Sequence, residues 1–295
     1  MNFTAYVARA FCHHSLGGNP AGVVLVNQES SFSTAQMQAI AKKLNFSETV
    51  FISPLGSHAY KALYFTPTSP IDFCGHATLA AFGVLKHLRL LKDSAYSLDT
   101  QVGKCEVILK EHLIFLSQPL PLIGDKILEA EITPIFGNDV SVDKPRPRIV
   151  STGLRDIFVR VSDEKSLQSL KPNLALLSEL NRKTNSVGMH VFSLDPLGSV
   201  YHAHCRNFAP LYGINEESAT GSSTGALACY LFKEGMLSIG SEHKLIFRQG
   251  DSLNAPSDIY VHLSTHEDTI KKVECGGEVV IDETMELRFP KKTTL

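Results

Sequence analysis

The sequence predicts an α+β protein built from two similar lobes, and three observations lead to this fold class. Short apolar or alternating runs, which are typical of strands, outnumber the helical patterns along the chain. One order of strands and helices appears twice, about half a chain apart, which indicates an internal duplication. Each half also contains a helix that opens at a glycine and continues through small and apolar residues, so we expect both helices to be buried.

The composition excludes several classes of protein. The chain has 295 residues, 43% of them hydrophobic, which suffices for a full core in one large domain or two ordinary ones. Its 28 basic and 30 acidic residues form no basic stripe, so no nucleic-acid partner is expected. The six cysteines form no CxxC pair, which favours reduced thiols and a cytoplasmic protein. We see no signal-peptide pattern and no apolar run of roughly 18 residues, so no membrane partner is expected.

The first half begins with predicted strands and one amphipathic helix. Ser33 is the expected N-cap of a helix over 34–44, where apolar residues recur at helical spacing. The cluster at 17–22 predicts a turn, and 66–70 predicts a loop that leads into the first buried helix. Strands are expected at 6–11, 23–26, 50–52, 60–65, 96–98, 105–109 and 113–116.

The second half repeats this order. A proline-containing stretch at 119–147 is interpreted as the connector, and a helix is expected over 174–182. We therefore predict an N-terminal lobe at 1–120, joined by a C-terminal strand at 280–295, and a C-terminal lobe at 121–279. Strands are expected at 149–152, 157–161, 188–194, 201–208, 244–247, 259–263 and 279–281, with the second buried helix opening at 219–223.

The two buried helices open with residues suited to a site. The first begins Cys74-Gly75-His76 and carries no charge until Lys86. The first N–H groups of a helix lack partners within the helix, and the helix dipole favours an anion there. If the lobes face each other, both helix ends can point into one cleft and hold a carboxylate. The alternative is a pair of core helices whose polar first residues only cap them.

The candidate acid and base groups are Glu48, His76, Glu217 and, with less support, Asp72. Glu48 stands between a polar turn and an apolar strand, so we expect partial burial to raise its pKa towards the range of a general base. Each has an ordinary alternative: Glu48 as a solvated surface residue, His76 as a capping or core histidine, and Glu217 as a favourable first-turn charge.

Two further patterns carry little chemistry. His202 and His204 would share one face of a strand, but no third ligand is placed by spacing, so no metal site is expected. Cys74 as a nucleophile would need a base, and His76 is a poor one because residues i and i+2 of a helix do not face each other. Nucleotide-binding and hydrolase motifs are absent.

Five motifs in order, from about residue 3 to about 285, give the chain a resemblance. Each is weak alone, but together they resemble the PhzF-like family, the phenazine-biosynthesis isomerase and its relatives. The motifs are Gly18-Asn19-Pro20-Ala21-Gly22-Val23-Val24, Asn45-Phe46-Ser47-Glu48-Thr49-Val50-Phe51, Phe65-Thr66-Pro67-Thr68, Cys74-Gly75-His76-Ala77-Thr78-Leu79-Ala80 and Ala219-Thr220-Gly221-Ser222.

The resemblance implies a fold like that of diaminopimelate epimerase, in which each lobe is a β-barrel-like sheet wrapped around a central helix. It also implies a site between the lobes, no metal or organic cofactor, and a homodimer. The family's proton-transferring glutamate maps onto Glu48, and its histidine maps onto His76. The carboxylate before the second helix maps onto Glu217, and the serine that follows Thr-Gly maps onto Ser222.

The chain departs from the family pattern at Glu217-Ser218, where the family has Asp-Pro. Our leading hypothesis is a cofactor-independent isomerase that moves a proton within a small anionic, carboxylate-bearing metabolite. The alternatives are a non-catalytic binding module on the same fold and, less favoured, a racemase that uses Cys74. The expected catalytic residues are Glu48, His76 and Glu217, and the expected substrate-binding residues are Asn19, Cys74, Gly75, Gly221 and Ser222.

Overall fold

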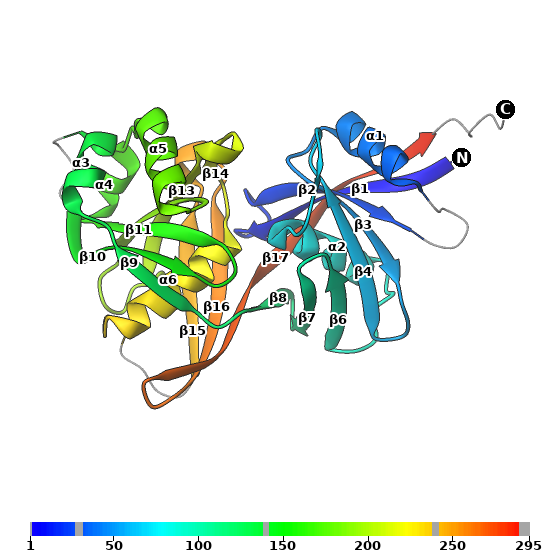
Figure 1. Cartoon of the computed structure of the whole chain (residues 1–295). Coiled ribbons are helices and arrows are strands. Elements are labelled where there is room, and N and C mark those ends of the chain that lie inside the picture. Colours follow the sequence, from blue (N-terminus) through cyan, green and yellow to red (C-terminus); the bar gives the residue numbers. More distant parts are fainter. Residues whose placement is uncertain (1, 27–31, 138–141, 238–241, 289–295) are drawn as a thin grey trace. The chain divides into compact units, whose positions relative to one another are not determined.

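The computed structural model describes residues 2–26, 32–137, 142–237 and 242–288. These residues form two compact units (Figure 1). Unit 1 takes its residues from 1–15, 19–116 and 277–295, and unit 2 takes its residues from 16–18 and 117–276. Residues 289–295 of the predicted C-terminal strand lie outside the described part of the chain.

Unit 1 consists of strands and two helices. The predicted helix over 34–44 is present as α1, and the first buried helix is α2. The elements are β1 (Asn2–Cys12), β2 (Asn19–Leu25), α1 (Thr34–Leu44), β3 (Thr49–Pro54), β4 (Ala59–Phe65), β5 (Pro70–Ile71), α2 (Gly75–His87), β6 (Ala95–Thr100), β7 (Gly103–Lys110), β8 (Leu113–Gln118) and the C-terminal part of β17 (Thr269–Arg288).

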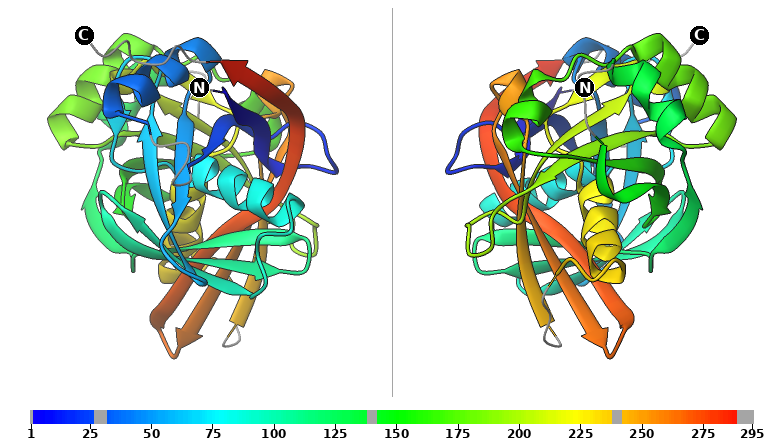
Figure 2. Two further views of the ribbon diagram at one scale, coloured as in Figure 1. Left: turned by 90° about the vertical axis from the view of Figure 1, so that its right-hand side faces the viewer. Right: turned by 90° about the vertical axis from the view of Figure 1, so that its left-hand side faces the viewer.

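The strands of unit 1 form a closed series around α2 (Figures 1 and 2). From β17 the series runs through β1, β2, β3, β4, β6, β7 and β8, and β8 pairs in turn with β17. The β2–β3 and β4–β6 pairs are parallel, while the other pairs with a known register are antiparallel. Helix α2 contacts β1, β2 and β3, as expected of a helix enclosed by its own sheet.

The sequence of α2 suits this enclosure. Every residue from His76 to Leu85 is buried, so the helix has no face that could carry a charge at low cost. Gly83 brings the helix close to β17, because a Cβ atom there would lie 2.3 Å from Val279 Cγ1. The hydroxyl of Thr78 bonds the Cys74 carbonyl at 2.8 Å and meets the Tyr64 hydroxyl at 2.6 Å, which ties the first turn to β4.

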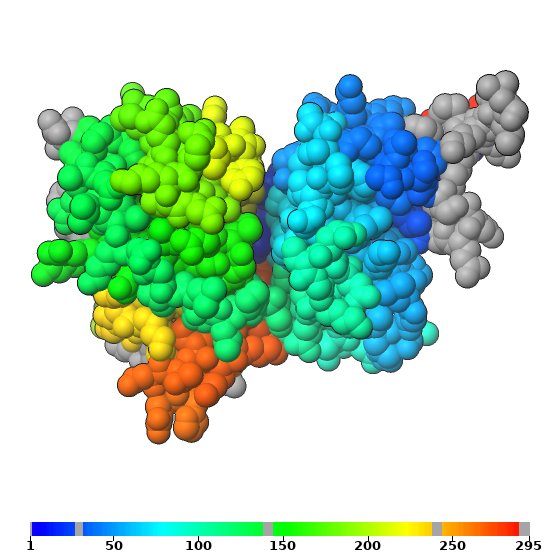
Figure 3. All heavy atoms as spheres, viewed as in Figure 1, coloured from blue at the N-terminus to red at the C-terminus, as the bar shows by residue number. Residues whose placement is uncertain are grey.

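Helix α1 confirms the capping prediction. Ser33 is the N-cap, and its hydroxyl and backbone N–H exchange bonds with Gln36 in a capping box. Asn45 ends the helix in the left-handed conformation. The buried face holds Met37, Ile40 and Ala41, and the other side chains form part of the surface of unit 1 (Figure 3).

Unit 2 contains a comparable set of elements. The second buried helix is α6, and the helix predicted over 174–182 is present as α5. The elements are β9 (Leu122–Lys126), α3 (Glu129–Phe136), β10 (Val142–Ser151), β11 (Arg155–Val161), α4 (Glu164–Ser169), α5 (Leu174–Thr184), β12 (Gly188–Leu194), β13 (Ala203–Ala209), β14 (Ile214–Glu217), α6 (Gly221–Lys233), β15 (Glu242–Gln249), β16 (Ser257–His266) and the N-terminal part of β17, with short 3-10 turns at Pro210–Tyr212 and Asp251–Leu253.

The strand pairing of unit 2 repeats that of unit 1. The series β9, β10, β11, β12, β13, β15, β16 and β17 has parallel pairs at β11–β12 and β13–β15, and its other pairs are antiparallel. A short strand, β14, pairs with β13 just as β5 pairs with β4. The repeated element order of the sequence is therefore a repeated pairing order in the structure.

Two sequence predictions are wrong. The stretch 119–147 is not a plain connector, because it contains β9, α3 and the start of β10. Pro145 and Pro147 lie where β10 pairs irregularly with β11, so they do not exclude a strand. The predicted turn at 17–22 is shorter than expected, because β2 already begins at Asn19. No helix among the described residues combines the length and apolarity needed to span a bilayer.

Candidate active site

Glu48 is held at the start of β3, one residue before the strand begins. Its backbone carbonyl accepts the N–H of Gly22 at 3.0 Å, so the residue is fixed against β2. Its side chain is 13% exposed. The ordinary alternative of a solvated surface glutamate is therefore wrong.

His76 lies next to Glu48. It is the second residue of α2 and is buried. Its Nε2 atom lies 3.2 Å from Glu48 Oε2, and its Nδ1 atom lies 3.4 Å from the side-chain amide of Asn19 at the start of β2. Three of the predicted site residues, from three different elements, therefore meet in unit 1.

The pair is ionised, and this corrects the expected pKa of Glu48. Burial raises the pKa of the Glu48 carboxyl, but the nearby His76 lowers it by more, so the net pKa lies below its usual value. Burial lowers the pKa of His76, while Cys74 and Glu48 raise it by more, and the net pKa lies well above its usual value. Because burial raises the pKa of the Cys74 thiol, that thiol is neutral near pH 7. Glu48 is then the charge that favours the imidazolium.

Cys74 contacts His76, which the sequence analysis did not expect. The Sγ atom lies 3.3 Å from His76 Nδ1 and 3.9 Å from Nε2. The rule that residues i and i+2 do not face each other applies within a helix. Cys74 is the N-cap and has an extended backbone, with φ of −147° and ψ of 118°, so its side chain is free of that restriction. Gly75 follows as the first residue of α2, while Asp72 is exposed.

Glu217 belongs to unit 2, where it is the last residue of β14. The hydroxyl of Thr220, the N-cap of α6, donates to Glu217 Oε2 at 2.8 Å. The buried amide of Gln249 donates to the Glu217 backbone carbonyl at 2.7 Å and to Thr220 Oγ1 at 3.1 Å. The neighbouring Glu216 is bound by Arg206 at 2.7 and 2.8 Å, which distinguishes the two adjacent carboxylates.

Gly221 and Ser222 open α6 as predicted. The Gln118 amide donates to the Gly221 carbonyl at 2.9 Å, and the Thr152 hydroxyl lies 3.0 Å from the Ser222 carbonyl. A Cβ atom at Gly225 would lie 2.0 Å from Gln118 Oε1, so the glycine leaves room for the Gln118 side chain. The prediction that the ends of α2 and α6 face one cleft stays a prediction.

A buried polar network beside α6 was missed by the sequence analysis. Ser223 donates to Asp156 Oδ2, and the Asn207 amide lies 3.3 Å from Ser223 Oγ and 3.2 Å from His190 Nδ1. Burial raises the pKa of Asp156 and lowers that of His190 to about 3. In the sequence these residues were only polar positions in or beside predicted strands, which does not by itself distinguish a site from a core hydrogen bond.

The two remaining histidines of the sequence analysis form no metal site in the described residues. His202 precedes β13, and its Nδ1 atom accepts the N–H of Ile246 at 3.3 Å. His204 lies within β13, and its Nδ1 atom is 2.8 Å from Asp195 Oδ1. The two imidazole rings therefore bind different partners and do not share a site.

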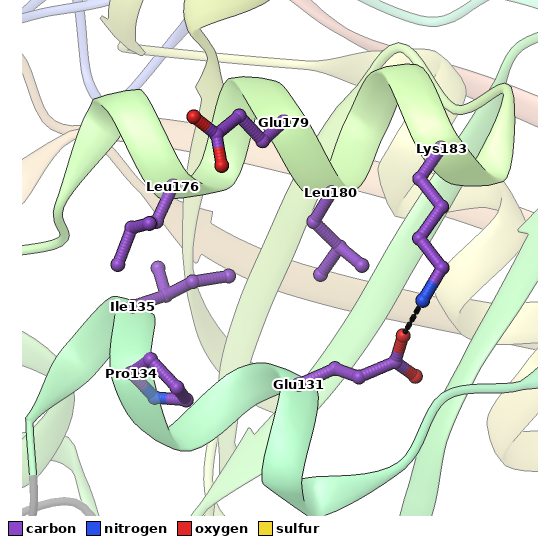
Figure 4. A pocket seen from close by; sticks show the side chains of 7 residues that line it. All are labelled: Glu131, Pro134, Ile135, Leu176, Glu179, Leu180 and Lys183. Carbon is purple, nitrogen blue, oxygen red and sulfur yellow. Dashed lines mark hydrogen bonds and ion pairs between the residues drawn. The ribbon is translucent and has the colours of Figure 1, made fainter.

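A surface groove between α3 and α5, with a volume of about 240 Å³, lies away from these groups in unit 2 (Figure 4). Its polar feature is an ion pair of 2.6 Å between Lys183 Nζ and Glu131 Oε1. Lys183 is 71% exposed, so the pair contributes little. None of the predicted site residues lines this groove. The residues that do are Glu131, Pro134, Ile135, Leu176, Glu179, Leu180 and Lys183.

Comparisons with known structures place this fold in one class, which includes PhzF-family proteins and epimerases. A solved structure from Bacillus anthracis, described as a phenazine biosynthesis protein of the PhzF family, superposes with a TM-score of 0.86 at 24% identity, covering 98% of this chain and 100% of that one. A hydroxyproline epimerase from Agrobacterium vitis shares the fold at a TM-score of 0.62 and 11% identity, covering 97% of this chain and 91% of that one.

The sequence comparisons are more specific. The family model described as phenazine biosynthesis-like protein, PhzC-PhzF, matches residues 8–284. An uncharacterized isomerase from Deinococcus radiodurans is 32% identical over 278 residues, which cover 90% of this chain and 88% of that protein. The trans-2,3-dihydro-3-hydroxyanthranilate isomerase of Pseudomonas chlororaphis is 27% identical over 278 residues, which cover 92% of this chain and 94% of that protein. The chain belongs to this PhzF-like family, several of whose curated members are named isomerases.

Proposed function

We propose that the chain is a cofactor-independent isomerase that moves a proton between two carbons of a small carboxylate-bearing metabolite. The observation that carries this proposal is the buried ion pair between Glu48 and His76, with 3.2 Å between Oε2 and Nε2. A general base must be deprotonated before it acts, and His76 keeps the pKa of Glu48 low, against the effect of burial.

Glu48 takes a proton from one carbon of the substrate and returns it to another, so the enzyme ends the cycle unchanged. His76, as the imidazolium, donates to an anionic group of the substrate. When His76 shares its proton with the substrate, Glu48 loses part of the interaction that lowers its pKa and becomes a stronger base. Asn19 and Cys74 contact the His76 ring and hold it in position for both partners.

The substrate is a small anion. The Pseudomonas chlororaphis relative is named for trans-2,3-dihydro-3-hydroxyanthranilate, and a cyclic carboxylic acid of this kind suits a site built from helix N-termini and an imidazolium. Gly75, Gly221 and Ser222 contribute backbone N–H groups, and Glu217 orients a hydroxyl or amino group. Glu217 stands where the family pattern has Asp, so we expect the substrate to differ from that of the relative.

The test is proton exchange with deuterated water. A panel of small cyclic and acyclic carboxylic acids, including trans-2,3-dihydro-3-hydroxyanthranilate, is incubated with the enzyme in D₂O, and deuterium in the recovered compounds is measured by mass spectrometry. We expect incorporation with wild type and its loss in Glu48→Gln. The matched control is Glu106→Gln, which changes an exposed glutamate of β7 in the same unit.

Equal exchange by wild type and Glu48→Gln would contradict the role of Glu48. A compound that binds and shifts the melting temperature, but never exchanges or isomerises, would favour the binding module over the enzyme. The contact of 3.3 Å between Cys74 Sγ and His76 Nδ1 favours a racemase as the second candidate function. In that case Cys74→Ser would abolish exchange while Glu48→Gln retained it.

A further inference from the structure

Three different metal-ligating groups converge in unit 1. One carboxylate oxygen of Glu48, the thiol sulfur of Cys74 and one ring nitrogen of His76 all lie within 4.8 Å of one another. Among the described residues, this group of three such side chains could hold a metal ion. It combines an oxygen, a sulfur and a nitrogen donor, a set that is typical of zinc and other late transition metals.

The distances between the three groups are close to those around a tetrahedral ion. Zinc bonds of about 2.3 Å to sulfur and about 2.0–2.2 Å to nitrogen and oxygen give ligand-to-ligand edges of roughly 3.4–3.6 Å. The observed edges are 3.9 Å from Cys74 Sγ to His76 Nε2 and 3.2 Å from His76 Nε2 to Glu48 Oε2. Cys74 Sγ lies nearer to His76 Nδ1, at 3.3 Å, than to Nε2, so the Cys74 and His76 side chains must rotate before the thiol and a ring nitrogen bind one ion. The carboxylate of Glu48 already lies next to Nε2.

The three ligands are held by rigid elements. Cys74 and His76 flank the first residue of α2, whose first turn is tied to β4 through Thr78 and Tyr64. Glu48 is anchored by the bond from Gly22 N–H to its carbonyl. The side-chain amide nitrogen of Asn19 stands 3.4 Å from the other ring nitrogen, His76 Nδ1, and this contact restricts the orientation of the ring.

We propose that Glu48, Cys74 and His76 form a binding site for Zn²⁺, and that the bound ion inhibits the enzyme. The ion takes three protein ligands and keeps a fourth position for water. On binding, the Cys74 thiol and the His76 imidazolium each release a proton to solvent, and no group is oxidised or reduced. Inhibition rests on the proposed function, because the ion occupies the groups that would move the proton; binding itself does not rest on it.

The site selects among cations by ligand type. A thiolate and an imidazole favour Zn²⁺ over Mg²⁺ and Ca²⁺, which prefer sets of oxygen ligands. The ion proposed here is an inhibitor and not a cofactor, so it is compatible with a reaction that needs no metal. It also gives a ligand role to Cys74, which the proton-transfer proposal uses only to position the His76 ring.

The experiment measures binding without any assay of activity. The full-length protein, kept reduced with a non-thiol reductant, is titrated with zinc chloride against a chromophoric chelator and, separately, with Co²⁺. We expect one tight Zn²⁺ per chain and, with Co²⁺, a thiolate-to-metal charge-transfer band together with the spectrum of a tetrahedral ion. Cys74→Ser should lose the band and, like His76→Gln, bind Zn²⁺ at least tenfold more weakly. The control is Cys105→Ser, which changes a partly exposed thiol of β7 in the same unit.

Absence of tight Zn²⁺ binding by wild type, or a charge-transfer band that persists in Cys74→Ser, would overturn the site. A band lost equally in Cys105→Ser would do the same. Deuterium exchange by chelator-treated enzyme tests the isomerase separately. If Zn²⁺ binds through Cys74 but exchange continues at full rate, the site stands and inhibition fails, and with it the proposed role of Glu48.

Discussion

The two buried helices, α2 and α6, occupy matching places in two units with the same pairing order, but their openings differ in chemistry. In unit 1 the opening of α2 holds an ionised pair, Glu48 and His76. In unit 2, burial beside α6 favours the neutral forms of Asp156 and His190. A repeated scaffold therefore carries a charged centre in one copy and an uncharged polar network in the other.

The difference follows from the partners of each histidine. His76 contacts the thiol of Cys74 at 3.3 Å and the carboxylate of Glu48 at 3.2 Å, and these interactions together outweigh the effect of burial on its pKa. His190 lies within 3.2 Å of the neutral amide of Asn207, so burial alone determines its pKa. Burial by itself thus favours the neutral form, and a charged partner at contact distance reverses the direction. Four changes can break or sharpen this comparison, and we take them in order of expected effect.

The largest effect is expected from Glu48→Gln. Glutamine keeps the size and a hydrogen-bonding oxygen but cannot take up the proton. We expect deuterium incorporation to fall by about 10²–10⁴-fold, the usual contribution of one general acid or base. Asp156→Asn changes the buried carboxyl of unit 2 in the same way and serves as the matched control. A comparable loss in both variants would show that the charged centre of unit 1 is not special.

The second change is His76→Gln, which removes the imidazolium and leaves Glu48 buried. Burial raises the pKa of Glu48 and His76 lowers it, so the variant should have a higher Glu48 pKa. Glu48 must be deprotonated to act, and the acid limb of the pH profile of kcat/KM should therefore move to higher pH. We also expect a rate loss of about 10²-fold. An unmoved acid limb, with His112→Gln as the exposed control, would contradict the coupling.

These two predictions depend on contacts that the sequence reveals only in part. Helix α1 was predictable because Ser33 and Gln36 lie three residues apart and cap it locally. The buried character of α2 was equally local, since no charge occurs in it before Lys86. The sign of the Glu48 pKa shift was not predictable, because it depends on the distance to a histidine that the fold brings to it from another element.

The remaining errors have similar causes. Cys74 was placed within a helix, but it is an extended N-cap, so its thiol reaches the ring of His76. Prolines at 145 and 147 indicated a connector, although the segment belongs to β10, which pairs with β9 and β11. Gln249 and Asp156 gave no distinct signal, because each is one of several polar residues in its strand and gains a role only from the neighbours that the fold supplies.

The third prediction compares His190→Gln with His76→Gln by the pH dependence of the free energy of unfolding. The folded pKa of His190, about 3, lies below the unfolded value of about 6.5. The unfolded chain therefore binds the proton first, and stability falls as pH falls below about 6.5. The slope is roughly 1 kcal/mol per pH unit. The folded pKa of His76 is raised, so its stabilisation is full below about 6.5 and is lost as pH rises through the folded pKa.

Urea unfolding between pH 5 and pH 8 measures both contributions. Relative to wild type, His190→Gln should gain stability as pH falls, and His76→Gln should lose it. The exposed control, His112→Gln, should follow wild type at every pH. Parallel curves for the two buried-site variants would contradict the opposite charge states that we assign to the two histidines.

The smallest effect is expected from Thr220→Val, which tests the α6 opening without touching the charged centre. The hydroxyl of Thr220 donates to Glu217 Oε2 at 2.8 Å. Valine keeps the shape while removing that donor, together with the acceptor of the Gln249 amide at 3.1 Å. One such bond contributes about 1 kcal/mol, so we expect KM to rise roughly fivefold if Glu217 orients the substrate. Glu48 and His76 are unchanged, and kcat and the acid limb of the pH profile should therefore stay as in wild type. The control is Thr133→Val, which removes a hydroxyl that bonds the Glu129 carbonyl within α3. A shifted acid limb in Thr220→Val would mean that the two openings do not act separately, and that the charge state of Glu48 depends on unit 2 as well as on His76.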